Sequence, residues 1–151
     1  MRLHRFARRI LAVAAGVAMA GCAAPQPAAD VETGVARIPR VSDLYAKATR
    51  VHVHRFRKPY VDERARVFQL LAKECDKLLA ETQTWEHSAR LTAAGTSEQS
   101  EVQDDIRALR SSLEGLRDAA STQDIDRARI SHLQALYAYS KVRRQLDATG
   151  P

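Results

Sequence analysis

Residues 102–116 read VQDDIRALRSSLEGL, and their large apolar side chains recur at alternating steps of four and three residues. The apolar positions are Val102, Ile106, Leu109, Leu113 and Leu116. Because an α-helix has about 3.6 residues per turn, this spacing places them on one helical face. The pattern lasts little more than two heptads, short of the three or four that favour an independent coiled coil. It therefore predicts a helix that packs inside a bundle.

A second helix is predicted before this segment, from about residue 61 to residue 91. Its apolar stripe also advances by three and four residues, and it is wide enough for two neighbouring helices. The stripe consists of Phe68, Leu71, Cys75, Leu78, Thr82, Trp85 and Ala89, widened by Val67, Leu70 and Leu79. Gly95 ends this helix, and Thr96 with Gln99 fits a capping box that starts the next one.

A third helix is predicted after the heptad segment and runs to about Leu146. Ser121 with Asp124 matches a helix start, so we expect a break near Ala120–Ser121 and not one continuous rod. The predicted inner face of this helix consists of Ile125, Ala128, His132, Leu133, Leu136, Tyr137 and Tyr139.

The segment 43–56 permits two interpretations. Ser42–Asp43 is an acceptable N-cap for a short helix over residues 44–56, whereas Val51-His52-Val53-His54 alternates as a short strand would. Pro59 ends either element, because proline lacks a backbone donor. With helices joined by short connections, we predict an all-α fold: a small antiparallel three- to four-helix bundle over residues 42–151.

The N-terminal residues have the layout of an export signal. Arg2, Arg5, Arg8 and Arg9 precede an apolar run over residues 10–20, which ends in Met19-Ala20-Gly21-Cys22. Eleven residues of helix are too short to cross a bilayer of about 30 Å. Residues 22–41 contain three prolines and Gly34 but few large apolar groups, and they predict a flexible tether.

The Ala-Gly-Cys ending resembles the lipobox of bacterial lipoproteins, although Met19 stands where that motif usually has leucine. The resemblance implies that residues 1–21 are removed and that Cys22 is acylated, which anchors the chain in a lipid bilayer. Because Ala23 and not aspartate follows the cysteine, it also implies the outer membrane, facing the periplasm.

The charge and the cysteine content of the chain limit its possible partners and its possible disulfide bonds. The chain carries 24 basic and 18 acidic side chains; removal of residues 1–21 takes four arginines and no acid, which leaves a formal charge of +2. Such a charge does not favour a nucleic-acid partner. If Cys22 is acylated, Cys75 is the one remaining thiol, so we expect no intramolecular disulfide and a buried Cys75.

Two groups of residues are candidate binding sites. On a strand, His52 and His54 would point to one face, where imidazoles can ligate copper or zinc. The basic stretch, which we define as Arg50, Arg55, Arg57, Lys58, Arg64 and Arg66, is interleaved with aromatic residues and suits phosphate or carboxylate groups, or else it is simply a solvated helix face. In an envelope compartment those anions would be lipid headgroups, lipopolysaccharide phosphates or acidic protein surfaces.

No catalytic motif is present: the chain lacks a glycine-rich phosphate loop, G-x-S-x-G, H-E-x-x-H and C-x-x-C. We therefore expect a non-enzymatic envelope lipoprotein without a cofactor, whose bundle binds another envelope protein. One version resembles the secretin pilotins, small helical lipoproteins that bind a partner helix in a groove. The alternative is a periplasmic metal- or small-ligand-binding lipoprotein that uses His52 and His54 or the basic residues between 47 and 66.

Overall fold

The computed structural model describes residues 34, 36–85 and 96–148 of the chain, and these form four α-helices without strands. The helices are α2 (Ile38–Val53), α3 (Tyr60–Trp85), α5 (Thr96–Ser121) and α6 (Ile125–Ala148). The predicted signal peptide, Cys22, Ala89 and Gly95 lie outside the described residues. The all-α prediction is confirmed, and none of the described helices is apolar enough over a sufficient length to cross a membrane.

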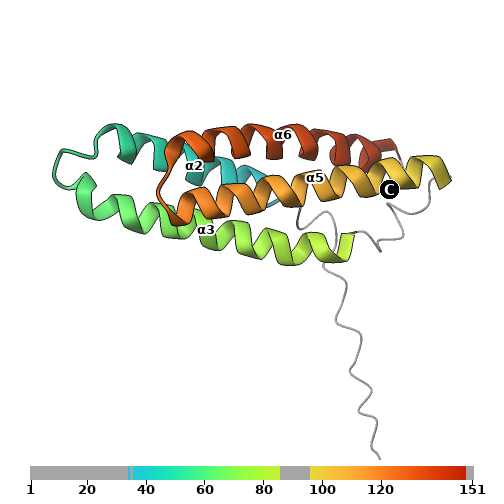
Figure 1. Ribbon diagram of the computed structural model, residues 1–151, viewed down its shortest axis with the longest axis horizontal. Coiled ribbons are helices and arrows are strands. Elements are labelled where there is room, and N and C mark those ends of the chain that lie inside the picture. Colours follow the sequence, from blue (N-terminus) through green and yellow to red (C-terminus); the bar gives the residue numbers. More distant parts are fainter. Residues whose placement is uncertain (1–33, 35, 86–95, 149–151) are drawn as a thin grey trace, which may run out of the picture.

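The four helices pack side by side, and each runs antiparallel to its neighbours (Figure 1). Helix α3 lies between α2 and α5, α5 lies between α3 and α6, and α6 also contacts α2. The α2–α3 connection extends past the α5–α6 turn at one end of the bundle, as Figure 1 shows on the left. Short connections between amphipathic helices produce this arrangement, because each helix buries its apolar stripe against the next.

The predicted stripes of α3 and α5 form the core. All five apolar positions of the heptad segment are at most 2% exposed, and so are Phe68, Leu71, Cys75, Leu78, Thr82 and Trp85 on α3. Leu70 was expected to widen the α3 stripe, but it is 43% exposed. The α3 stripe is therefore narrower than predicted on that side.

Residues 51–53, whose alternating sequence suggested a strand, form the last turn of helix α2. Val51 is buried and Val53 is 63% exposed. A strand would place these two side chains on the same face, whereas a helix separates residues two apart by about 200°. The helix begins at Ile38, with Arg37 at its N-cap and proline in its first turn, six residues before the predicted start at residue 44. The strand interpretation is wrong, and the N-cap predicted at Ser42–Asp43 lies inside the helix.

The residues just before α2 are held against α3. Gly34 is buried, and a Cβ on it would overlap the indole ring of Trp85. The Arg37 guanidinium pairs with Glu81 at 2.7 Å and with the buried Glu74 at 3.6 Å. Residues 34–41 were predicted as part of the tether, but most of them belong to the bundle.

The break between α5 and α6 occurs close to the predicted position. Gln123 adopts a left-handed backbone conformation with φ of 55°, and the Asp124 side chain accepts a hydrogen bond from the Arg127 amide at 3.0 Å. Ser121 does not cap α6; its hydroxyl donates to the Arg117 carbonyl within α5. The predicted helix start is confirmed, with Asp124 as its N-cap.

The predicted inner face of α6 is confirmed in part, because Ala128 and His132 are buried and three further predicted residues pack partly buried against the core: Ile125, Leu136 and Tyr139. Ala128, Ala135, Ala138 and Val142 are buried, whereas Leu133 and Tyr137, predicted on the inner face, are 60% and 66% exposed. Gly115 shows why small residues face inward here, since a Cβ on it would lie 2.8 Å from the Ser131 hydroxyl of α6. Helices that approach this closely exclude large side chains from their interface.

Candidate functional site

The large apolar side chains that are exposed fall into two groups. Within residues 34, 36–85 and 96–148 they are Val53, Phe56, Val61, Leu70, Ile130, Leu133 and Tyr137. Three lie at or beside the α2–α3 connection and three lie on α6, with Leu70 apart from both. Single exposed apolar residues are ordinary, but contiguous groups rimmed by polar residues mark interaction surfaces.

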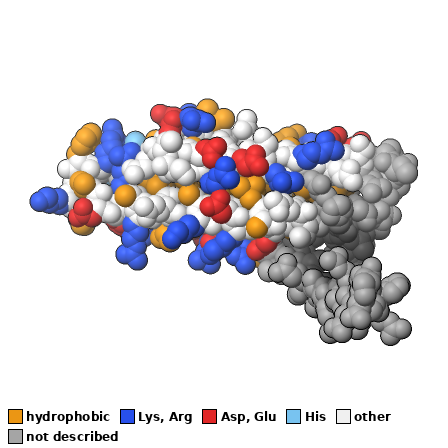
Figure 2. All heavy atoms as spheres, turned by 60° about the horizontal axis from the view of Figure 1, so that its bottom comes forward, with side chains coloured by type: hydrophobic (Ala, Val, Ile, Leu, Met, Phe, Trp, Pro, Cys, Tyr) orange, Lys and Arg blue, Asp and Glu red, His pale blue; other side chains and the backbone are white. Residues whose placement is uncertain are grey.

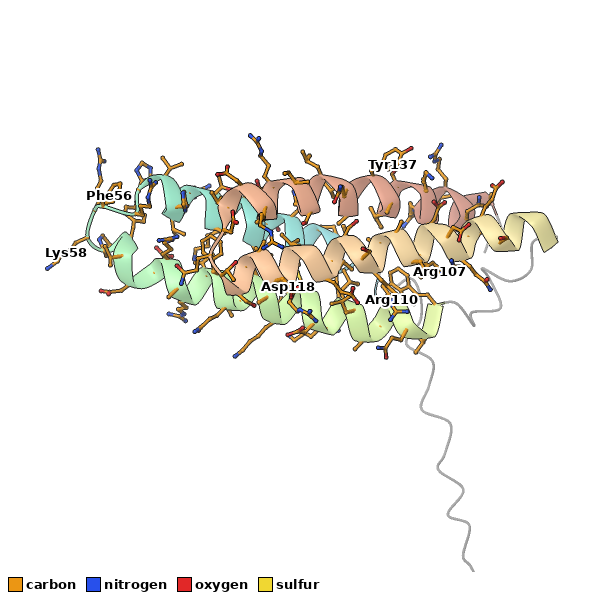
Figure 3. The ribbon with its side chains drawn as sticks, in the orientation of Figure 1. Phe56, Lys58, Arg107, Arg110, Asp118 and Tyr137 are labelled. Carbon is orange, nitrogen blue, oxygen red and sulfur yellow. The ribbon has the colours of Figure 1, made fainter. Side chains whose placement is uncertain are left out.

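The α6 stripe, which we define as Ile130, Leu133 and Tyr137, advances by three and four residues and so occupies one face over two turns. Beside it, a cavity of about 550 Å³ opens between α5 and α6. Small side chains of Ala108, Ser111, Ser112 and Ala138 line it together with Leu133, Gln134 and Tyr137. Figure 3 shows Tyr137 extending from α6 away from the bundle.

The floor of this α5–α6 groove is less polar than its serines suggest. The Ser112 hydroxyl donates to the Ala108 carbonyl at 2.8 Å, which satisfies its hydrogen inside α5. Lys141 lies 5.4 Å from the centre of the Tyr137 ring and donates to Asp105 at 2.9 Å, so it already has an anionic partner. The groove therefore offers apolar contact and close approach more than it offers free charge.

The basic stretch does not form one continuous surface. Arg64 donates to the Gln123 carbonyl at 3.2 Å and lies over the Phe68 ring, so it joins α3 to the α5–α6 turn. Arg55 donates to the His52 carbonyl and stacks on Phe56. The remaining residues of the stretch are exposed: Arg50, Arg57, Lys58 and Arg66.

His52 and His54 lose the geometry that suggested a metal site. In an α-helix, a separation of two residues means a rotation of about 200° about the helix axis, so the two side chains point to nearly opposite sides. His54 packs against Tyr60 with ring centroids 5.3 Å apart, and burial together with Arg55 and Arg64 lowers the pKa of His52. In the part of the chain that the structure describes, no group of three or more His, Cys, Asp or Glu residues is arranged to hold a metal ion.

His132, which was predicted on the inner face of the last helix, connects α6 to α2. Its ring stacks on Tyr45 at 4.3 Å, and its Nε2 atom lies 3.0 Å from the Ser42 hydroxyl. Burial lowers the pKa of His132 from 6.5. The folded chain therefore binds this proton less readily than the unfolded chain does.

We expect the bundle to lose stability as the pH falls below 6.5, because protonation of His132 then favours the unfolded chain. Above pH 6.5 this contribution is fully present. His132→Phe keeps a ring for Tyr45 but cannot titrate, so it should reduce the pH dependence. Urea unfolding at several pH values checks this, and His52→Gln measures the contribution of the second histidine whose pKa is lowered. An equally steep pH dependence in His132→Phe would contradict the assignment.

Several side chains of types that can act in catalysis, a thiol and three carboxylates, have structural roles. Cys75 is fully buried, and burial raises the pKa of its thiol to about 12. Asp104 pairs with Arg107, Asp105 pairs with Lys141, and Asp124 caps α6. Arg107 and its neighbour Arg110 lie on α5, as Figure 3 shows. Each of these three carboxylates therefore has a partner within the bundle, either a basic side chain or a backbone amide.

Comparison with protein families, with curated proteins and with solved structures finds no match for this chain. The candidate surfaces therefore depend on the geometry alone.

Sequence reasoning missed the α6 stripe as an exposed surface because it favours large apolar residues for the core. A signal was nevertheless present. The series Ala128, His132, Ala135, Ala138 and Val142 continues along the whole helix, whereas Ile130, Leu133 and Tyr137 cover only two turns. The longer series is the buried one.

Proposed function

We propose that this protein is a non-enzymatic cell-envelope lipoprotein, anchored through Cys22, whose helical bundle binds an amphipathic helix of another envelope protein. The observation that carries the proposal is the exposed α6 stripe beside the α5–α6 groove. Apolar side chains exposed over two helical turns, next to a floor of small residues, suit a partner helix that inserts its own apolar face.

The chemistry of the groove favours a helix over a charged ligand. Ala108, Ser111 and Ser112 allow a partner backbone to approach closely, while Leu133 and Tyr137 supply apolar area on one side. Lys141, which lies 5.4 Å from the centre of the Tyr137 ring, is paired with Asp105. The partner helix is therefore expected to present leucine-like residues at steps of three and four. This is the binding mode of a pilotin-like assembly module.

No specific observation favours the alternative of a metal- or small-ligand-binding lipoprotein. It depended on a strand through His52 and His54, and that segment is a helix ending at Val53. The basic stretch is divided between structural contacts and the exposed α2–α3 connection.

The test uses a photo-crosslinking residue at position 130 in the full chain, expressed with its own N-terminal segment in bacteria. In detergent-solubilised envelopes it should crosslink one defined protein, through a segment with helical apolar spacing. Leu133→Asp combined with Tyr137→Asp should weaken binding of that protein by about 10-fold or more, because each charge would be desolvated in the complex. Leu70→Asp on α3 is the matched control and should bind as the unaltered chain does.

Recovery of the lipoprotein alone, or equal capture by the double variant, would contradict the protein-binding proposal. The anchor is checked in the same preparation by the mass of the N-terminal peptide, which should begin at Cys22 and carry fatty acyl groups. A peptide that begins at Met1, or an unmodified Cys22 thiol, would contradict the lipoprotein assignment.

A further inference from the structure

The second exposed apolar group lies where α2 turns back into α3. We define the hairpin tip as residues 53–61, which join the end of α2 to the first turn of α3. Phe56 is 85% exposed, the most exposed of the large apolar side chains described, and Val53 and Val61 are more than half exposed. Water-exposed apolar groups at a turn of this kind do not contribute to the core of the bundle.

Cations surround these apolar side chains. The Arg55 guanidinium lies 4.6 Å from the centre of the Phe56 ring. Arg57 and Lys58 are exposed, and neither reaches a carboxylate within ion-pair distance among the described residues. The nearby Glu63 is already paired with Lys47 at 2.9 Å. The tip is therefore positively charged as well as apolar.

The tip is convex. It extends past the α5–α6 turn at the end of the bundle, where Figure 3 shows Phe56 and Lys58 at the extremity of the molecule. Figure 2 shows basic and apolar side chains together at this end. An exposed aromatic ring on a convex surface can insert into the deformable headgroup region of a bilayer more easily than it can form a complementary interface with a protein.

We infer that the hairpin tip docks on an anionic phospholipid bilayer, with Phe56 in the headgroup region and Arg57 and Lys58 against lipid phosphates. Aromatic side chains favour the membrane interface, and each cation near an anionic surface strengthens binding by about fivefold. The charge of the tip complements an anionic lipid surface, whereas the residues that line the α5–α6 groove include no charged side chain.

The chain is long enough for the tip and the proposed Cys22 anchor to reach one bilayer. Helix α2 spans residues 38–53, about 24 Å at 1.5 Å per residue. Residues 22–33, which precede the contact of Gly34 with Trp85, could reach about 40 Å if fully extended. Two contacts would then hold the bundle along the membrane, and the second contact goes beyond the proposed function because it uses neither Cys22 nor the α6 stripe.

The test places a tryptophan at the tip of the full chain, purified in detergent and reconstituted into vesicles. The chain contains one tryptophan, the buried Trp85, so the unaltered protein supplies the blank. In vesicles that contain phosphatidylglycerol, emission of Phe56→Trp should shift to the blue and be quenched by brominated acyl chains. In phosphatidylcholine vesicles both effects should be several-fold smaller.

Two variants make the result specific. Adding Arg57→Gln and Lys58→Gln to Phe56→Trp should weaken binding of the tip to the anionic vesicles by about 25-fold, because each of the two cations contributes about fivefold. Tyr137→Trp is the matched control on α6, and bromolipids should not quench it. Equal quenching at positions 56 and 137, equal quenching in neutral vesicles, or none at all would overturn the inference.

A protein partner at the tip would give a different result. A photo-crosslinker at position 56 would then capture an acidic envelope protein, while Phe56→Trp would remain unquenched in anionic vesicles. That outcome also overturns the bilayer assignment. It would leave the proposed function intact, because the crosslink at position 130 and the Leu133 and Tyr137 variants test a different surface.

Discussion

Leu113→Ala is expected to lower the free energy of unfolding by about 3 kcal/mol. Leu113 is fully buried on α5, the helix that contacts both α3 and α6. Truncation removes three carbon atoms, Cγ and the two methyl groups, from the core and leaves a cavity that the neighbouring helices can fill only partly. Urea unfolding followed by circular dichroism measures the change.

Leu70→Ala is the matched control for this truncation, since it is the same substitution on a side chain that is 43% exposed. Its cost should stay below about 1 kcal/mol, because much of the leucine surface already contacts water. Equal losses in the two variants would show that the core is not centred on the α5 heptad segment.

Trp85→Ala is expected to cost about 3–5 kcal/mol and to release the residues before α2. Trp85 is fully buried at the end of α3, and Gly34 lies so close to its indole ring that there is no room for a Cβ. Without the ring, the contact that holds residue 34 is lost. Trypsin should then cut after Arg37 and Arg40 sooner than in the unaltered chain.

Trp85→Phe distinguishes the loss of this contact from a general loss of the fold, because phenylalanine fills most of the same space. Its cost should be well below that of Trp85→Ala, with trypsin cleavage after Arg37 close to that of the unaltered chain. If both variants are cleaved at the unaltered rate, Arg37 and its carboxylate partners alone hold this segment.

The fold was largely predictable because three helices carry their own apolar period. Spacing alone identified the buried face of α5. The break before α6 was predicted from the pair Ser121 and Asp124, although Asp124 and not Ser121 caps the helix. The start of α2 was not predictable in the same way. It depends on contacts of Arg37 with Glu74 and Glu81 on α3, and no local pattern reports contacts between distant residues.

The candidate surfaces were only partly predictable. The basic stretch indicated the hairpin tip, but it did not reveal that Arg64 is used inside the fold. Two residues of the α6 stripe, Leu133 and Tyr137, were assigned to the core because they are large and apolar. The greater length of the other apolar series on α6 was the available signal, and close packing, as between Gly115 and Ser131, favours that series because its side chains are smaller.

The Arg37 ion pairs have a mechanical consequence. Any tension applied to the N-terminal segment enters the bundle at Gly34 and Arg37, at one end of α2. The force would act first on the ion pairs of Arg37 with two carboxylates of α3, and only then on the buried side chains between the helices. Arg37 is one-third exposed, so water can replace its partners as they separate. A pull on the chain should therefore peel α2 from its start while the other three helices remain assembled.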